Sequence, residues 1–199
     1  MRDARIGRIL VASLHQAIAD IMPTRLDFYE NWLSVGGLRD GTIGLAPMYA
    51  VLSFLRQEGD VYAAITTRAG TYAAEWTIES LPAARRTMIR VAPRWLRSRM
   101  LIGVARGIVR SSYRDSRAIA RVRRGTARID LRASIFCSVR EPVPQPLCWF
   151  YVAAVTRLME LFGIDADAEV VACRARGEAT CIVEVALGRP PAHAAAIGS

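Results

Sequence analysis

The chain has 199 residues, 52% of them hydrophobic, which is enough to fill the core of one domain and too apolar for a disordered protein. Its net charge of +9 comes from 27 basic and 18 acidic residues, and every basic residue is arginine. A chain of this length does not need disulfide staples, and its start lacks the apolar stretch of a signal peptide. We therefore expect reduced thiols and a cytoplasmic protein.

The first 115 residues carry patterns typical of helices. Apolar residues recur at helical spacing over 5–21, and Pro23 ends that helix. Shorter helices are predicted over 26–33 and 45–57, the second with Pro47 in its first turn, where a missing N–H costs nothing. The pattern over 61–67 fits either a strand or the start of a helix, whereas 71–81 is helical.

A long basic segment follows over 83–112, also helical, and Pro93 is expected to kink or split it. No acidic residue occurs between Glu79 and Asp115, so the nine arginines of that stretch equal the net charge of the whole chain. These are Arg85, Arg86, Arg90, Arg94, Arg97, Arg99, Arg106, Arg110 and Arg114.

Three interpretations of this basic segment stay open. The simplest is a helix that packs on the domain and leaves its arginine face in water. The second is an anionic membrane surface, because apolar residues such as Trp95 interleave with the arginines, and it would place the protein at the periphery of the inner membrane. Its candidate contacts are Arg85, Arg86, Arg90 and Arg94. Nucleic acid is the least favoured partner, since no DNA-binding motif accompanies the charge.

After residue 115 the pattern changes to the period of strands. Runs over 117–123 and 127–137 alternate around a hairpin turn at Arg124-Gly125, and a helix is predicted over 147–162. Two further strands, 169–174 and 180–187, follow it. This order predicts an α+β fold: a helical layer over 1–115 and an antiparallel sheet of about four strands with one covering helix over 116–188, together one compact domain. Residues 189–199 are expected to be a disordered tail.

The last predicted hairpin brings two cysteines together. With Gly177 at the positive-φ position of its turn, Cys173 and Cys181 lie opposite each other. Val171 and Val183 are then expected on the same buried face.

The other two cysteines are expected to point toward the same region. Parity along 127–137 places Cys137 on the apolar face of its strand. Cys148 begins the covering helix, whose positive end favours a thiolate. The four sulfurs could therefore form a zinc or iron site, a redox pair, or simply part of the core. Burial is the simplest of these, because no CxxC pair is present.

A family resemblance rests on the same residues. The stretch Pro146-Leu147-Cys148-Trp149-Phe150-Tyr151 and the hairpin Cys173-x3-Gly177-x3-Cys181 resemble the C-terminal part of the 4-vinyl reductase domain family. The similarity covers residues 130–187. That family resembles a wider ligand-binding fold shared with Golgi transport-particle subunits and haem-based nitric oxide sensors.

The resemblance implies several functional properties. It implies a homodimer that binds a tetrapyrrole, lipid or hydrocarbon, with Cys148, Cys173 and Cys181 beside the ligand as metal ligands or thiol contacts. A reductase or an accessory subunit of (bacterio)chlorophyll synthesis is the second expectation, and a membrane-tethering subunit is the third. Whether the protein is an enzyme stays open, since the sequence has no nucleotide-binding fingerprint and His15 is the one histidine before the tail.

Overall fold

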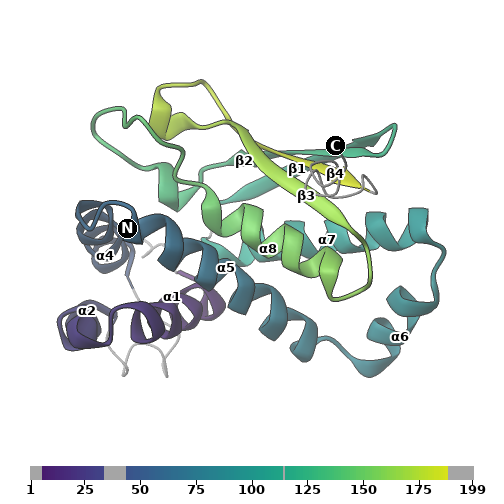
Figure 1. The fold of residues 1–199 in the computed structure, drawn as a ribbon, viewed down its shortest axis with the longest axis horizontal. Coiled ribbons are helices and arrows are strands. Elements are labelled where there is room, and N and C mark those ends of the chain that lie inside the picture. Colours follow the sequence, from purple (N-terminus) through teal and green to yellow (C-terminus); the bar gives the residue numbers. More distant parts are fainter. Residues whose placement is uncertain (1–5, 34–43, 114, 188–199) are drawn as a thin grey trace, which may run out of the picture.

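The computed structural model describes residues 6–33, 44–113 and 115–187, so the predicted tail over 189–199 lies outside the described residues. Figure 1 shows helices stacked on one side of a single antiparallel sheet, and the prediction of an α+β fold is confirmed. The helices are α1 (Arg8–Ile21), α2 (Leu26–Leu33), α4 (Leu45–Gln57), α5 (Val61–Ser80), α6 (Ala83–Val91), α7 (Arg94–Ser112) and α8 (Trp149–Glu160). The strands are β1 (Arg117–Arg123), β2 (Thr126–Arg132), β3 (Ala166–Ala172) and β4 (Cys181–Leu187).

The helical half follows its sequence signals closely. α2 and α4 have the predicted bounds, and the ambiguous stretch 61–67 is the beginning of the 20-residue helix α5. Pro93 splits the basic segment into α6 and α7 rather than kinking one helix. It stands at the N-cap of α7, where its missing N–H leaves no helical hydrogen bond unmade.

The sheet has the strand order β1-β2-β4-β3, with antiparallel neighbours throughout. The predicted hairpin turn joins β1 to β2: Arg124 and Gly125 have φ angles of 48° and 79°, as a two-residue turn of the primed type requires. β4 lies between β2 and β3, so the hairpin with the cysteines is joined directly to the first hairpin.

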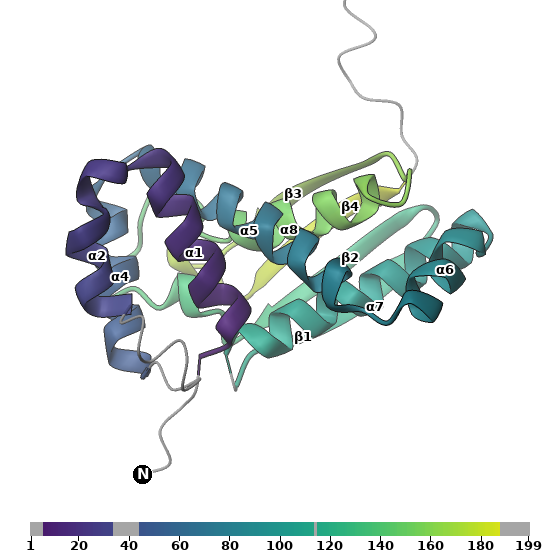
Figure 2. The ribbon, with the colours of Figure 1, turned by 90° about the horizontal axis from the view of Figure 1, so that it is seen from below.

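Helices cover one face of this sheet. α7 packs against β1, α8 packs against β3 and β4, and α5 lies on the far side of α8 with α1 against it (Figures 1 and 2). Buried apolar residues of α1, α5, α7, α8 and the sheet form one continuous core. The opposite face of the sheet is polar, with Arg128, Arg132 and Glu169 exposed on it.

The sheet differs from prediction in three details, of which the first is that β3 covers Ala166–Ala172 rather than 169–174. The other two have local causes. The strand predicted over 127–137 is wrong beyond Arg132, because Ala133 adopts a φ of 54° and Ile135–Cys137 forms a turn of 3-10 helix. Val171 is 38% exposed instead of buried, because a bulge between Val170 and Ala172 reverses the alternation of β3. In both places a local backbone irregularity shifts the side chains relative to strict two-residue alternation.

Candidate functional site

The four cysteine sulfurs meet at one place. The Sγ atoms of Cys137, Cys148, Cys173 and Cys181 all lie within 4.8 Å of one another. The shortest separations are 3.0 Å between Cys137 and Cys148 and 3.4 Å between Cys137 and Cys173. Cys148, Cys173 and Cys181 are buried, while Cys137 is partly exposed. None of the four forms a disulfide.

Three separate segments bring these sulfurs together. Cys137 ends the 3-10 turn after β2, and Cys148 is the N-cap residue of α8. Cys173 and Cys181 flank the hairpin turn and adjoin the last paired residues of β3 and β4, Ala172 and Ile182. The sequence analysis placed Cys137 on a strand, whereas this residue ends a 3-10 turn. Its sulfur nevertheless lies beside the other three.

The turn of the cysteine hairpin is held by specific backbone contacts. Gly177 has a φ of 90°, as its predicted place in the turn requires. The Glu178 carboxylate accepts a hydrogen bond from the N–H of Cys173. Val143, from the proline-rich loop before α8, donates its N–H to the carbonyl of Ala175 at 2.7 Å. These contacts fix the hairpin against the loop that leads to Cys148.

Two backbone N–H groups point at the sulfurs. The N–H of Leu147 donates to Cys173 Sγ at 3.4 Å, and the N–H of Arg174 donates to Cys181 Sγ at 3.3 Å. Hydrogen bonds to a thiolate favour its charged form. Contact with the Cys137 thiol and then with the Cys148 thiol lowers the pKa of Cys173, while contact with Cys137 raises the pKa of Cys148. The cluster is therefore arranged to stabilise negative charge on the hairpin sulfurs.

The cluster has the size of a mononuclear metal site. Four thiolates bound to zinc at about 2.3 Å form a tetrahedron with edges of about 3.8 Å. The observed separations of 3.0, 3.4 and 4.0 Å scatter around that value. Thiolate ligation suits zinc and iron. The residues therefore fit one such ion, with all four cysteines as ligands, and the N–H donors of Leu147 and Arg174 would support the bound sulfurs.

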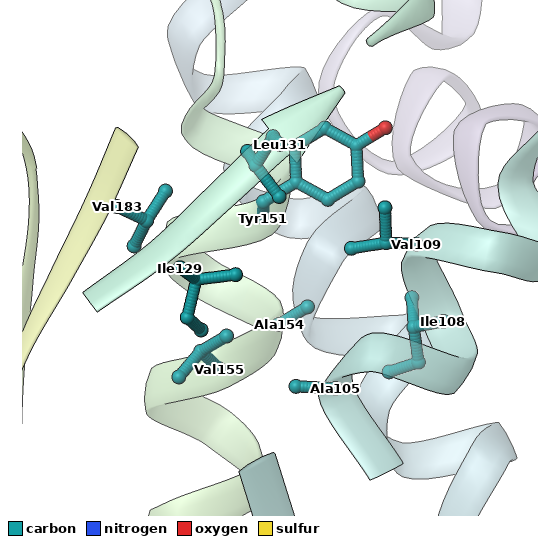
Figure 3. A pocket seen from close by; sticks show the side chains of 9 residues that line it. All are labelled: Ala105, Ile108, Val109, Ile129, Leu131, Tyr151, Ala154, Val155 and Val183. Carbon is teal, nitrogen blue, oxygen red and sulfur yellow. The ribbon is translucent and has the colours of Figure 1, made fainter. Parts of the chain in front are cut away.

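A small apolar cavity lies farther along α8. Figure 3 shows its wall, formed by side chains from α7, α8 and the sheet. The lining residues are Ala105, Ile108, Val109, Ile129, Leu131, Tyr151, Ala154, Val155 and Val183. Its volume is about 10 Å³, about that of one water molecule. Ala105 and Ala154 face each other across it with the smallest side chains of the wall (Figure 3).

Tyr151 contributes its ring to this apolar wall, and its hydroxyl points away from the other lining side chains (Figure 3). Its side chain is 2% exposed, and its hydroxyl has no hydrogen-bond partner. Burial raises the pKa of Tyr151, and the nearby Cys148 adds to that rise. Interaction with the nearby Ser134 hydroxyl lowers the same pKa, although neither of these two buried hydroxyls completes a hydrogen bond. Sequence reasoning missed Tyr151 and Ser134, since a single tyrosine in an apolar helical stripe carries no signal.

An aromatic cluster connects the cavity to the cysteines. Phe136 stacks on Phe150 with ring centroids 5.0 Å apart and meets Tyr151 edge-on at 5.5 Å. Phe136 directly precedes Cys137, and Phe150 and Tyr151 follow Cys148 within the first turn of α8. The sulfur cluster and the cavity wall are therefore joined by a continuous set of ring contacts.

The unpaired Tyr151 hydroxyl leads to a stability prediction. Burying a hydroxyl without a partner costs free energy, so Tyr151→Phe should stabilise the protein by about 1 kcal/mol. Tyr62→Phe is the matched control, because the buried Tyr62 hydroxyl donates to the carbonyl of Leu147 at 3.2 Å. That variant should lose about 1 kcal/mol. Urea unfolding of both variants checks the opposite signs, and a loss of stability in Tyr151→Phe would contradict the prediction.

The remaining sequence candidates lie elsewhere. Arg85, Arg86, Arg90 and Arg94 belong to α6 and the beginning of α7, at the end of the molecule opposite α2 and α4 (Figures 1 and 2). His15 on α1 pairs with Glu30 at 2.7 Å and is not part of the cavity wall. Among the described residues, no helix has both the length and the apolar character needed to cross a membrane.

Comparisons with solved structures identify the fold. The chain is similar to the phenol-responsive sensory domain of the transcription activator PoxR, at 15% identity over 71% of this chain and 73% of that one, with a TM-score of 0.52. It is also similar to H-NOX proteins. An Fe(II) unliganded mutant from K. algicida has 12% identity, coverage of 94% and 98%, and a TM-score of 0.60. One from S. oneidensis in the Fe(II)NO ligation state has 10% identity, coverage of 92% and 100%, and a TM-score of 0.55.

At these identities the similarity establishes the fold alone. No protein-family model matches the chain, and no curated protein matches it.

Proposed function

We propose that the protein is a small-molecule-binding domain whose apolar cavity is held in shape by a metal ion on the four cysteines. The observation that carries this proposal is the apolar cavity between α7, α8 and the sheet, whose lining residue Tyr151 keeps a buried hydroxyl without a hydrogen-bond partner. Ligand sites are mostly apolar with a few placed polar groups, and Tyr151 would be such a group. The ligand class is a small apolar molecule with one hydroxyl or carbonyl oxygen.

The similar structures support this class of function. The PoxR domain responds to phenol, and the S. oneidensis H-NOX protein is described in an NO-ligated state. The resemblance to the 4-vinyl reductase domain family, with its cysteine hairpin, supports a ligand-binding role as well. The metal ion would be structural, since the four cysteines supply all the ligands of a closed tetrahedral site.

A tetrapyrrole fits this cavity poorly. The cavity volume of about 10 Å³ is far below the several hundred Å³ of a pocket for a ligand as large as a tetrapyrrole. Of the residue types that serve as haem axial ligands, the lining offers Tyr151 alone, and burial raises the pKa of its phenol. An organic ligand must therefore separate α7 from α8, and a small one separates them least.

Calorimetric titration with phenol, toluene and hexane tests the proposal. Wild type should bind phenol and toluene in the micromolar to millimolar range. Ala154→Leu fills the cavity from the α8 side, and Tyr151→Phe keeps the ring but removes the hydroxyl. The first variant should bind none of the three compounds, and the second should lose phenol affinity while keeping toluene affinity. Unchanged binding in Ala154→Leu, or no binding to wild type at millimolar concentration, would rule the proposal out.

A further inference from the structure

The junction of α6 and α7 exposes large apolar side chains close together. Met88 is 52% exposed, Val91 74%, Trp95 64% and Leu96 37%. We call residues 83–99, which carry them, the elbow. Single exposed apolar residues are ordinary, but four within nine positions form a patch. Both views place α6 at the end of the molecule, where it packs against α7 (Figures 1 and 2).

The elbow is also strongly basic. It contains Arg85, Arg86, Arg90, Arg94, Arg97 and Arg99, and no acidic residue occurs between Glu79 and Asp115. The ion pairs of the described residues involve none of these arginines. Their charge is therefore uncompensated by neighbouring carboxylates, and it lies on the same two helices as the exposed apolar side chains.

Arg97 has a different role from the other elbow arginines. Its guanidinium donates to the carbonyls of Arg90 at 2.7 Å, Ala92 at 3.0 Å and Phe162 at 3.1 Å. It thereby ties the end of α6 to α7 and to Phe162, just beyond the end of α8. These contacts fix the position of α6 relative to α7. Ile89 is the residue of α6 buried in the core, and the apolar patch stays exposed.

We propose that the elbow is a docking surface for an anionic lipid bilayer. A tryptophan with short apolar neighbours suits the boundary between headgroups and acyl chains, and surrounding arginines suit anionic headgroups. A second copy of the chain fits less well, because pairing the elbow with itself would bring two sets of arginines together. A nucleic acid would meet the arginines but leave Met88 and Val91 without an apolar partner.

Sedimentation with sucrose-loaded vesicles tests this surface. Wild type should bind vesicles of phosphatidylcholine with 30% phosphatidylglycerol, should bind pure phosphatidylcholine weakly, and should be released by 0.5 M salt. The variant R85Q/R86Q/R90Q/R94Q should bind the anionic vesicles about 100-fold more weakly. The variant M88S/V91S/W95S, changed at exposed positions alone, should also lose binding while keeping its melting temperature.

A matched control separates the elbow from overall charge. Arg117, Arg121, Arg123 and Arg128 are exposed on β1 and β2, and changing all four to glutamine removes the same charge elsewhere. This control should keep most of the binding. Brominated acyl chains should quench Trp95 in wild type, and the quenched component should vanish in W95F.

Three results would overturn the proposal. One is equal loss of binding in the control and in the elbow arginine variant. Another is a vesicle-independent dimer that M88S/V91S/W95S dissociates, with no vesicle binding, which would assign the patch to self-association. The third is salt-sensitive binding of a DNA duplex that the elbow arginines alone support, with no binding to vesicles.

Discussion

Replacing Cys173 and Cys181 together by serine should remove one bound zinc or iron per chain and lower the melting temperature by about 10 °C. An ion that binds the folded state alone, at a free concentration about a thousandfold above its Kd, stabilises that state by about 4 kcal/mol. Each kcal/mol moves the melting temperature of a chain this long by about 2–4 °C. All four sulfurs lie within 4.8 Å, so losing two ligands destroys the site. Elemental mass spectrometry and calorimetry measure the two effects.

Chelation of wild-type protein provides the control for that experiment. Removing the ion with a strong chelator should reproduce the lower melting temperature of the double variant, and restoring zinc should reverse it in wild type alone. A wild type that is purified without chelator, contains no metal and melts independently of added zinc would contradict the prediction. The cysteines would then act as ordinary core residues.

Replacing Gly70 by alanine should destabilise the protein by about 3 kcal/mol. Gly70 lies where α5 crosses α8, and a Cβ atom there would stand 2.2 Å from the carbonyl oxygen of Phe150 and 3.0 Å from the Cβ of Ala153. The first contact is with backbone, which cannot rotate away as a side chain can. The two helices must separate, and this cost exceeds the gain of about 1 kcal/mol that alanine brings to a helix.

Gly103 and Gly107 on α7 are the matched controls. Both are helical, exposed, and without atoms within 4 Å of an added Cβ. Gly103→Ala and Gly107→Ala should therefore stabilise the protein by about 1 kcal/mol each. Urea unfolding of the three variants compares the same chemical change in two environments. Equal effects at all three positions would show that α5 and α8 do not depend on close approach at Gly70.

Elements with strong local signals could be predicted well from sequence. Helical periodicity and a proline in the first turn were sufficient for α4, and Arg124-Gly125 was sufficient for the turn between β1 and β2. The stretch after Arg132 could not be predicted in this way. Its alternation continues to Cys137, but Ala133 turns the chain into a 3-10 helix. Alternation alone does not distinguish a continuing strand from a turn that preserves the same order of apolar residues.

The candidate site likewise has one part that local sequence predicts and one part that depends on tertiary packing. The pairing of Cys173 with Cys181 depends on a local turn at Gly177, and the sequence contains that information. The cavity depends on how α7, α8 and the sheet pack, and the missing partner of the Tyr151 hydroxyl is a property of that packing alone. The face of Val171 was predicted wrongly because one bulge residue in β3 reverses every side chain on one side of it.

The spacing of the cysteines along the chain has a consequence for the order in which the molecule opens. Cys148 lies 11 residues after Cys137, and Cys173 lies 25 residues after Cys148. Cys181 follows Cys173 closely. A shared ion would close all these loops at once, and short loops have a small closure entropy. With the ion bound, the hydrogen-bonded amides of α8, β3 and β4 should exchange only through global unfolding. Without it, the same elements should open on their own before the helical half does.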